Sequence, residues 1–462
     1  MNKKYSRLIG DMGIFALGAL GSKLVLFILL PIYTNVMSDS EYGIADLVFT
    51  GGDLLLPFIS LAIYNGLLRF GLIKDKTKAS LLNATVIFLA GTVLAVALTP
   101  LAGLYAPLRE WKWYMCVYVL AHFARSNSLI YLKVKDKNKA YSVLSIAQAL
   151  LLVGFNVLFL ILLKWGIRGY LLSTILSNAL LSILAFIIGG ERRDLQEAQF
   201  DKQLFKEMIL YSLPFVFNDI SWLVIRSCDK FMLEGMIGAA ALGIYTAASK
   251  IPSLVNALTS IFSQAWGLAS IKEHDSTNET CFYSGVFRYF STFTFGAAIL
   301  IIAITKPFMS VYVGQAFRES WHYVPLLLVS AVFDAISTFA GGLFGAFKQS
   351  KYIMTSTIVA GVTNVIVNYI FIQTLGIYGA VIGTVSAHFI VALLRIISLK
   401  IKIRSLDFNF QRLGILAALV LVQAIMVGLN TYGYIVSAVT FVLYLIIAKN
   451  DLFEIIYSLK AK

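Results

Sequence analysis

Charged residues interrupt an apolar stretch between positions 219 and 252, and five of them are the side chains best placed to bind an ion or a polar ligand. They are Asp219, Arg226, Asp229, Lys230 and Lys250. An ionisable group in the hydrocarbon core of a bilayer costs at least ~2.5 kcal/mol, so such groups usually face a bundle interior or a water-filled cavity. Positions 219, 226 and 230 fall on one helical face, because steps of seven and four residues nearly close whole turns. The spacing predicts a charged stripe that lines a lumen.

Membrane-spanning helices are the elements that must position these charges. Of the 462 residues, 59% are hydrophobic and 13% are charged, and the mean hydropathy is +0.82. This composition is typical of an all-α, polytopic membrane protein and excludes an ordinary soluble globular domain. The formal net charge is +14. Its basic residues cluster in short segments between apolar runs, which indicates membrane topology rather than nucleic-acid binding.

A helix needs about 20 mainly apolar residues to cross the hydrocarbon core. Applied along the chain, this requirement predicts about fourteen transmembrane helices, at 10–35, 42–70, 80–104, 112–134, 140–163, 168–189, 206–233, 240–269, 282–304, 322–347, 352–373, 378–399, 411–430 and 434–449. The first run is too long for a signal-peptide core and has no clear cleavage site. We therefore expect it to remain as a transmembrane helix.

Basic residues alternate between the predicted loops. With the N-terminus inside, the inner segments hold most of them, for example Lys133, Lys135, Lys137 and Lys139, and later Arg395, Lys400, Lys402, Arg404 and Arg412. The outer segments hold only Arg109, Lys112, Lys164, Arg168, Lys306 and Arg318. Because cytoplasmic loops carry the excess of Lys and Arg, the alternation predicts that both termini are cytoplasmic.

An internal repeat predicts two lobes. SEYGIADLVFTGGDLL (40–55) aligns with AALGIYTAASKIPSLV (240–255), and WGIRGYLLSTILSN (165–178) aligns with LGIYGAVIGTVSAH (375–388). Repeats six spans apart keep one orientation, which predicts parallel halves forming a V around a central cleft. The expected parts are an N-lobe of six helices (1–190), a cytoplasmic linker (191–205), a C-lobe of six helices (206–400), and two further helices with a tail (401–462).

Two segments resemble a known family. The run DKFMLEGMIGAAALGIYTAASKI (229–251) resembles the Asp-Lys/Arg…Gly-x-Tyr-x-x-Ala-x-Lys signature of bacterial Wzx-type polysaccharide flippases, and LPIYTNVMSDSEYG (30–43) is similar to their first loop. These flippases form the polysaccharide transporter family of the MATE/MOP exporter superfamily, together with drug-extruding MATE proteins and lipid II flippases. The resemblance implies alternating-access movement of undecaprenyl-pyrophosphate-linked oligosaccharide from the inner to the outer leaflet of the bacterial cytoplasmic (inner) membrane.

A diphosphate headgroup requires cationic donors in a shielded cavity, where Arg offers a bidentate fork and Lys a point charge. The candidates are Arg226, Lys230 and Lys250 of the C-lobe, with Lys23 and Arg125 of the N-lobe. The alternative for each cation is a structural ion pair with a neighbouring Asp. For Arg288, near the predicted cytoplasmic mouth, we expect that structural role.

Acidic residues in the spans are the expected partners of these cations or of a coupling ion. Asp46 and Asp53 lie seven residues apart on one helical face, with Thr50 between them. In the repeat, Thr50 corresponds to Lys250, so one lobe offers carboxylates where the other offers an ammonium. Either the lobes form an ion pair across the cleft, or an Asp binds H⁺ or Na⁺ and couples transport to the ion gradient. The other candidates for these roles are Asp219, Asp229 and Asp334.

Other functions compete with this one. A MATE-type cation or drug antiporter and a lipid II flippase are the alternatives within transport, and the intramembrane Lys and Arg residues favour an anionic substrate. A membrane glycosyltransferase or polymerase is a third alternative. The sequence contains no HExxH motif, no phosphate loop with GK[ST] and no plausible nucleophile triad. We therefore expect a secondary transporter with no catalytic residue.

Three widely spaced cysteines indicate neither a disulfide framework nor a metal site. We expect no cofactor, apart from H⁺ or Na⁺ as coupling ion. The expected partners are the lipid-linked glycan, membrane lipid and, from the resemblance, the polymerase and glycosyltransferases of the same pathway. Nucleic acid is not an expected partner.

Overall fold

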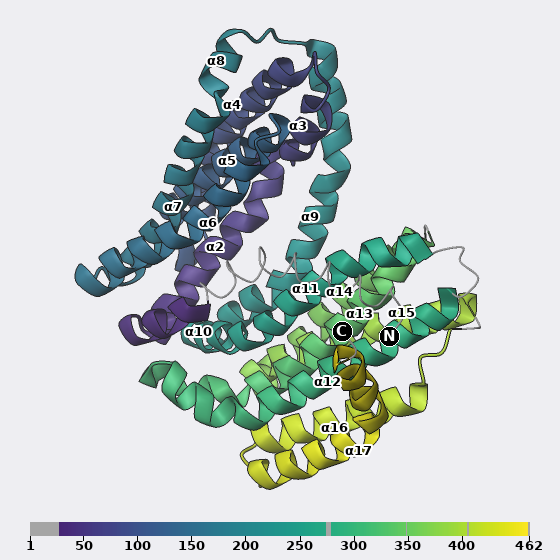
Figure 1. Cartoon of the computed structure of the whole chain (residues 1–462). Coiled ribbons are helices and arrows are strands. Elements are labelled where there is room, and N and C mark those ends of the chain that lie inside the picture. The colour runs from purple at the N-terminus through teal and green to yellow at the C-terminus, as the bar shows by residue number, and fades with distance from the viewer. Residues whose placement is uncertain (1–26, 274–278, 348, 404–405, 461–462) are drawn as a thin grey trace. The chain divides into compact units, whose positions relative to one another are not determined.

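The computed structural model describes residues 27–273, 279–347, 349–403 and 406–460. Within these ranges the chain is helical and has no strand (Figure 1). The all-α prediction is confirmed. After a short apolar helix at Phe27–Val36, the N-terminal half contains α2 (Asp39–Ser60), α3 (Ile63–Gly71), α4 (Thr77–Ala102), η1 (Ala106–Leu108), α5 (Lys112–Val134), α6 (Asn138–Asn156), η2 (Val157–Leu162), α7 (Gly166–Gly189) and α8 (Glu191–Gln196).

The C-terminal half begins with the longest described helix, α9. Its elements are α9 (Lys202–Ile237), α10 (Ala239–Ala248), α11 (Lys250–Glu273), α12 (Glu279–Tyr312), η3 (Gln315–His322), α13 (Val324–Ala346), α14 (Ser350–Leu375), α15 (Ile377–Lys402), α16 (Phe410–Gly428) and α17 (Gly433–Lys460).

Within the described residues, ten helical segments are long and apolar enough to cross a bilayer. They belong to α2, α4, α6 with η2, α7, α12, α13, α14, α15, α16 and α17. The chain is therefore a multi-pass membrane protein. The count of fourteen stays a prediction, because the expected span 10–35 lies mostly outside the described residues and α5, α9 and α11 are not among the ten.

Two of the expected spans are broken. The span predicted at 42–70 comprises α2 and α3, separated by Leu61 and Ala62 in the left-handed region (φ 49° and 48°). The Ser60 hydroxyl accepts a hydrogen bond from the Ala62 amide at 3.2 Å, which satisfies one backbone donor released by the break. The span predicted at 240–269 likewise divides into α10 and α11, directly before Lys250. Interrupted helices at membrane depth occur where the chain lines a cavity or is buried in protein.

The chain divides into two compact units. We call Ile32–Glu234 with Gly238–Gly243 the N-terminal unit, and the described parts of Met1–Pro31, Gly235–Ile237 and Ile244–Lys462 the C-terminal unit. Most of α9 thus belongs to the N-terminal unit, although the repeat assigns it to the C-lobe. Repetition in sequence and compactness in space are different properties, so the lobe boundary at 191–205 stays a prediction.

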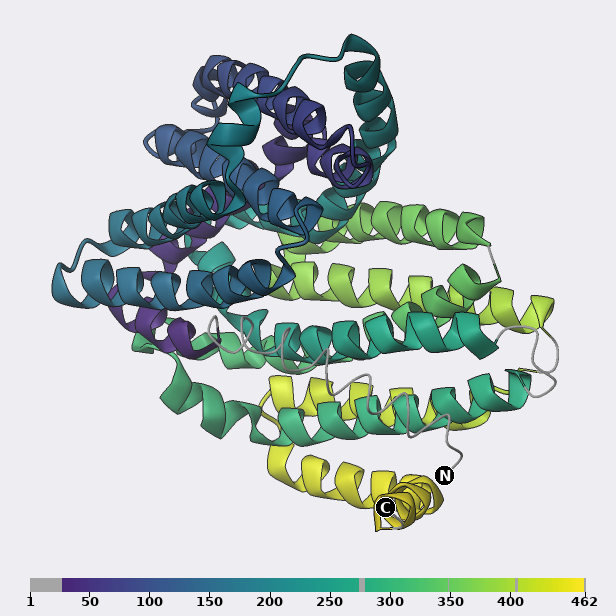
Figure 2. The same cartoon turned by 45° about the horizontal axis from the view of Figure 1, so that its top comes forward.

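Each unit packs around its own core. In the N-terminal unit, α5 packs against α2, α3, α4 and α7, and Phe123 of α5 is completely buried among apolar side chains of these helices. In the C-terminal unit, α13 packs against both α11 and α15, and α15 also packs against α14. Figure 2 gives a second view of the helices. Trp266 is fully buried there, stacked on Phe339 at 4.4 Å between ring centroids.

Side-chain caps fix the start of two helices that carry charged residues. Ser38 and Glu41 form a capping box before α2, in which the Ser38 hydroxyl accepts from the Glu41 amide and the Glu41 carboxylate accepts from the Ser38 amide. Asp201 caps α9 by accepting from the Leu204 amide at 2.9 Å. Such caps satisfy backbone donors that a helix leaves unpaired in its first turn.

The repeat has a structural counterpart in a glycine contact between α2 and α10. A Cβ added to Gly43 would lie 2.1 Å from the Ala239 carbonyl oxygen, and one added to Gly243 would lie 1.9 Å from the Asp39 carbonyl oxygen. Residues 39 and 239, like 43 and 243, are equivalent in the repeat. The contact is therefore self-complementary, as expected where two related segments meet on a two-fold axis. Both glycines are required for close backbone approach.

Gly243→Ala should lower the melting temperature of the purified protein, because the new methyl group forces α2 and α10 apart, and overpacking costs about 1–3 kcal/mol. Gly154→Ala in α6 is the matched control, since nothing lies within 4 Å of an added Cβ there. Alanine at this helical position should be neutral or stabilising by up to about 1 kcal/mol. Equal melting temperatures for the two variants in detergent would contradict the glycine contact.

Two acids of α8, Glu191 and Asp194, are buried. Burial raises the pKa of Glu191 to about 7, opposed by a hydrogen bond to the Ser128 hydroxyl and reinforced by nearby Asp194. Burial alone would raise the pKa of Asp194 too, but the Tyr131 hydroxyl and the Lys135 ammonium lower it below its ordinary value. These groups donate to Asp194 at 2.6 and 2.9 Å. Asp194 is therefore a structural anion, and Glu191 is a buried acid that titrates near neutral pH.

Glu191→Gln should flatten the dependence of stability on pH. The folded-state pKa of Glu191 is about 7, above the ordinary value of 4.5. The buried, protonated carboxyl group therefore contributes to the free energy of unfolding below pH 4.5, and this contribution is lost as the pH rises through 7. The loss is roughly 3 kcal/mol. Thermal unfolding at about pH 5 and pH 8 should show the variant more stable than wild type only at the higher pH. If the melting temperatures of variant and wild type depended on pH in the same way, Glu191 would not be the group responsible for this loss of stability.

Candidate functional site

An intramembrane ion pair joins α9 to α2 within the N-terminal unit. The Lys230 ammonium lies 2.8 Å from the Asp46 carboxylate, and both side chains are largely buried. The same ammonium donates to the Thr50 hydroxyl at 3.4 Å. Asp229 is also buried, and its carboxylate accepts from the Lys230 amide at 2.9 Å. Among the cations predicted to bind a diphosphate whose side chains the structure describes, Lys230 is the one in a direct ion pair with a carboxylate.

Asp53 lies two turns further along the same face of α2 and contacts α5. The Tyr118 hydroxyl donates to Asp53 Oδ1 at 2.8 Å, and His122 Nδ1 lies 3.6 Å from the same oxygen. Gly52 permits this approach, because a Cβ there would lie 2.7 Å from the Tyr118 ring. The sequence analysis did not single out Tyr118 or His122. A histidine three residues before Arg125 in an apolar span was the available signal.

Arg125 occupies the next turn of α5 after His122. Its guanidinium is half-buried, and its Nε atom is buried without a hydrogen-bond partner among the described residues. Asp53 and Tyr118 are among the groups whose charge acts on it. The structure thus brings Arg125 close to Asp53. The sequence analysis had assigned Arg125 to diphosphate binding and Asp53 to ion coupling or pairing between the lobes.

Asp219 of α9 forms a hydrogen bond with a residue at the start of α3, just after the break between α2 and α3. Its carboxylate accepts from the Tyr64 hydroxyl at 2.6 Å. Asp46, Asp53, Asp219 and Asp229 therefore all lie in the N-terminal unit, on α2 and α9. Lys23 and the side chain of Arg226, two of the predicted cations, lie outside the residues that the structure describes.

Lys250 and Asp334 belong to the C-terminal unit. Lys250 is the first residue of α11 and Asp334 lies in the middle of α13. Both are half-buried. Among the described residues, neither side chain forms a hydrogen bond or an ion pair. Lys250 is therefore a cation in a predicted span that no carboxylate of the described residues neutralises.

Arg395 is a buried cation that the sequence analysis placed among the basic cytoplasmic residues. It lies within α15, is only 5% exposed, and donates to the Ser356 hydroxyl at 3.0 Å, the Ser337 carbonyl at 3.0 Å and the Thr357 hydroxyl at 2.9 Å. These bonds join α15 to α13 and α14. Satisfied donors and multiple helix contacts indicate that Arg395 holds the C-terminal unit together.

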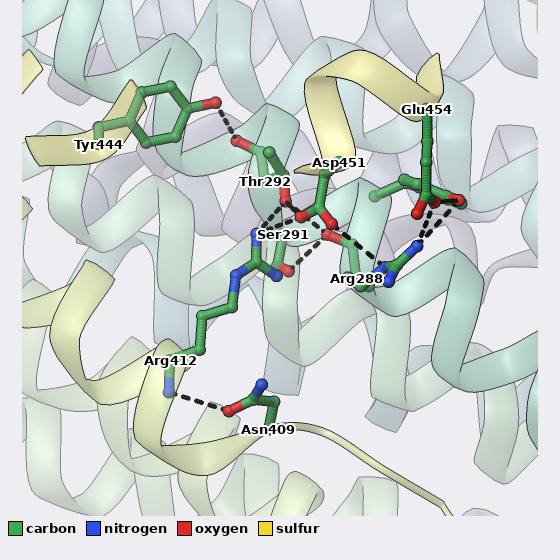
Figure 3. Close-up of polar contacts among 9 residues, drawn as sticks. Arg288, Ser291, Thr292, Asn409, Arg412, Tyr444, Asp451 and Glu454 are labelled. Atoms are coloured by element: carbon green, nitrogen blue, oxygen red, sulfur yellow. Dashed lines mark hydrogen bonds and ion pairs between the residues drawn. The ribbon is translucent and has the colours of Figure 1, made fainter. Parts of the chain in front are cut away.

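Figure 3 shows a network of charges that joins α12, α16 and α17. Arg288 forms ion pairs with Asp451, at 3.3 Å, and with Glu454, while Arg412 pairs with Asp451. The Thr292 hydroxyl completes the network by donating to Asp451 at 2.7 Å. Arg288 thus has the acidic partners expected of a structural residue. A cavity of about 580 Å³ adjoins the network between α12 and α16, lined in part by Arg288, Asp407 and Arg412.

A double-mutant cycle on Asp46 and Lys230 should show that the two residues stabilise each other. Asp46→Asn or Lys230→Gln alone leaves one charge unpaired, and breaking a buried pair in this way costs up to about 3–5 kcal/mol. The double variant should recover part of that loss, with an interaction free energy of about 0.5–3 kcal/mol in thermal unfolding. Lys250→Gln, at a lysine without a partner among the described residues, is the control and should not lower the melting temperature, because it removes a charge that no described residue pairs. If the stability losses of the two single variants simply added in the double variant, Asp46 and Lys230 would not stabilise each other.

Comparison with known proteins identifies the family of the chain. The family model described as polysaccharide biosynthesis protein matches residues 8–267, a range that includes the α2, α5, α9 and Lys250 positions above. No curated protein matches the sequence significantly.

Solved structures share the fold over nearly the whole chain. The lipid II flippase MurJ, in an inward closed conformation, is similar with a TM-score of 0.67 and 16% identity, over 96% of this chain and 99% of that chain. An inward-facing multidrug resistance MATE family transporter of the MOP superfamily has a TM-score of 0.67 and 15% identity, over 85% of this chain and 95% of that chain. The chain therefore has the helical fold of MOP superfamily transporters and belongs to the polysaccharide biosynthesis protein family.

Proposed function

We propose that the protein is a flippase that moves undecaprenyl-pyrophosphate-linked oligosaccharide from the inner to the outer leaflet of the bacterial cytoplasmic membrane. The family, the transporter fold and the intramembrane charges support this proposal. Alternating access driven by an ion gradient is the proposed mechanism, with both termini in the cytoplasm. The polymerase and glycosyltransferases that act on the same glycan are the proposed partners.

The observation that carries the proposal is the unpaired ammonium of Lys250. It is half-buried at the start of α11, with no hydrogen-bond or ion-pair partner among the described residues. A buried charge without a counter-ion destabilises a membrane protein. A ligand that brings negative charge into this region relieves the cost when it binds. A diphosphate does so with several acceptor oxygens, whereas a cationic drug would add a second positive charge.

The charges of each unit favour a diphosphate lipid over the cationic substrate of a MATE-type antiporter. Four carboxylates of the N-terminal unit have hydrogen-bonding or ionic partners within that unit, so they are partly neutralised before any ligand binds. Lys250 and Arg125 keep donors that no described residue uses. The donors available to a ligand are therefore cationic, which favours an anionic headgroup over a cation antiporter.

Lipid II is the second candidate substrate. The likeness to the lipid II flippase MurJ over 96% of this chain favours it. Its headgroup is also attached through a diphosphate, so the cations would have the same role. The two candidates differ in their biological consequence: depletion of a lipid II flippase is lethal, whereas deletion of a surface-glycan flippase removes the glycan and leaves the cell viable.

Deletion of the gene and analysis of the lipid-linked sugars that accumulate is the decisive experiment. The proposal predicts an accumulated lipid-linked oligosaccharide, loss of surface glycan and unchanged drug susceptibility. Increased drug susceptibility without accumulation of the lipid-linked sugar would overturn the proposal in favour of a drug antiporter.

Lys250→Gln should abolish complementation of the deletion strain, because the headgroup loses a charge-assisted bond of about 1.5–3 kcal/mol or more. Lys250→Arg keeps the charge and should retain part of the activity, with the protein present at wild-type level in the membrane. Restoration of surface glycan by Lys250→Gln at wild-type level would show that this ammonium does not bind the substrate.

A further inference from the structure

The cavity between α12 and α16 of the C-terminal unit is large enough for a ligand. Its volume is about 580 Å³, within the range of small-molecule sites in proteins, about 300–1,000 Å³. Its walls include the start of α12, the start of α16 and the segment 407–409 that leads into α16. Both helices begin predicted spans at the predicted cytoplasmic face. With that topology, the cavity lies at the depth of the headgroups of the inner leaflet.

The segment 407–409 is held in place by contacts with both helices. The Asp407 amide donates to the Ser284 hydroxyl of α12 at 3.0 Å. Phe408 is only 3% exposed and packs edge-on against Phe287 of α12, with 4.9 Å between the ring centroids. Asn409 caps α16 with its side chain (Figure 3). The walls of the cavity are therefore part of the folded protein and do not need a ligand to form.

Arg412 presents hydrogen-bond donors to this cavity. Its side chain is 16% exposed and lines the cavity wall. Its side-chain contacts with described residues, to the Thr292 hydroxyl and to Asp451, all use the single nitrogen Nη2 (Figure 3). Nε and Nη1 therefore keep N–H groups that no described residue uses. An arginine with such donors suits a phosphate, because its planar fork matches two phosphate oxygens.

The Asp407 carboxylate brings an acceptor to the same cavity. It lines the wall and is exposed, and its Oδ1 accepts from the Asn409 amide at 2.9 Å. No cation among the described residues forms an ion pair with it. The cavity thus combines a carboxylate that can accept from an ammonium with an arginine that can donate to a phosphate.

The balance of charge around the cavity disfavours a ligand with a net negative charge. Two arginines and three carboxylates of the described residues lie in or beside it, namely Arg288, Arg412, Asp407, Asp451 and Glu454. They provide no excess of positive charge for an anionic headgroup. A zwitterionic headgroup adds no net charge, and each of its ends meets a group of opposite sign.

We propose that this cavity binds the headgroup of a phospholipid with a primary ammonium, of which phosphatidylethanolamine is the simplest. The phosphate accepts from Arg412, and the ammonium donates to Asp407. A quaternary ammonium, as in phosphatidylcholine, has no N–H to donate, so the site distinguishes the two lipids. The inference goes beyond the proposed function, because this lipid is a bound component of the transporter and not the molecule that it moves.

Exposed apolar side chains continue from the cavity into both spans. Phe293 of α12, one turn after the cavity residue Tyr289, is 63% exposed, and Ile415 of α16, one turn after Arg412, is 45% exposed. Lipid surrounds a multi-pass membrane protein at this depth, so the acyl chains can pack on these side chains while the headgroup enters the cavity. This arrangement favours a lipid over a water-soluble phosphoethanolamine.

Native mass spectrometry of the purified, delipidated full chain tests this preference. The probes are phosphatidylethanolamine, phosphatidylcholine and phosphatidylglycerol with identical acyl chains, at equal concentrations. Wild type should retain phosphatidylethanolamine most strongly. Asp407→Asn should reduce that retention roughly 2- to 5-fold, the effect of one exposed ion pair, and should leave retention of phosphatidylcholine unchanged.

Asp136→Asn is the matched control. Asp136 is also exposed and also accepts from the asparagine two residues later, Asn138, at 2.9 Å, but it lies between α5 and α6. This variant should retain phosphatidylethanolamine as wild type does. Equal retention of the three lipids by wild type, stronger retention of either of the other two, or equal losses in Asp407→Asn and Asp136→Asn would overturn the proposal.

A soluble analogue distinguishes a lipid from a cytoplasmic metabolite. Glycerophosphoethanolamine has the same phosphate and ammonium without acyl chains. Wild type should retain it far less than phosphatidylethanolamine at the same concentration. Retention as strong as that of the lipid would overturn the assignment of the cavity to a lipid.

Cys281 provides a second readout that needs no substitution. Its thiol is exposed and lines the cavity, whereas Cys116 is buried. Labelling of Cys281 by a water-soluble maleimide should be slower in nanodiscs that contain phosphatidylethanolamine than in nanodiscs of phosphatidylcholine alone, and equal rates would overturn the site. This result decides the proposal even if Asp407→Asn does not fold. Neither readout depends on transport, so both hold whether or not the protein flips a lipid-linked sugar.

Discussion

The ion pair between Lys230 and Asp46 shows the constraint on which the structure depends: a charge in a membrane-spanning segment needs a partner inside the protein. The pair is 2.8 Å long and largely buried, and it fixes α9 to α2 within one compact unit. The same constraint accounts for the hydrogen bond between Asp219 and Tyr64 and for Arg395, whose three guanidinium nitrogens each donate a hydrogen bond. Because these charges have partners, cationic donors with no partner among the described residues become informative. The Lys250 ammonium and Arg125 Nε are two such donors.

Glycine complements charge as a positioning device. Gly52 lets Tyr118 reach Asp53, and Gly43 with Gly243 lets α2 and α10 cross at backbone contact. These helix crossings place the acidic face of α2 against α5 and α9, where its carboxylates meet a phenol, an imidazole and an ammonium. Small residues at helix interfaces are the usual means of close packing in membranes. In this protein they determine which side chains reach the carboxylates, and so they belong to the chemistry of the site as well as to its stability.

Much of the fold was predictable because hydropathy and charge distribution directly reflect the bilayer. The all-α class, the multi-pass topology and the superfamily follow from apolar runs and from the 229–251 motif. The breaks after Ser60 and Ala248 were not predictable, because the flanking residues are as apolar as those of a continuous helix. The partners of the charged side chains could not be predicted from the sequence either. Asp46 and Asp53 share a helical face, yet Asp46 meets a lysine and Asp53 meets a histidine and a tyrosine, which depends on how α5 and α9 pack and not on spacing along α2.

The central claim is that cationic side chains without a partner among the described residues bind a diphosphate lipid headgroup. Native mass spectrometry of the purified full chain, with equal amounts of undecaprenyl diphosphate, undecaprenyl phosphate and a cationic dye such as ethidium, tests it most directly. The account predicts that the diphosphate lipid is retained most strongly, that the monophosphate is retained less, and that Lys250→Gln removes the difference between them. Preferential retention of the dye, or equal retention of the two lipids by the wild-type protein, would contradict it.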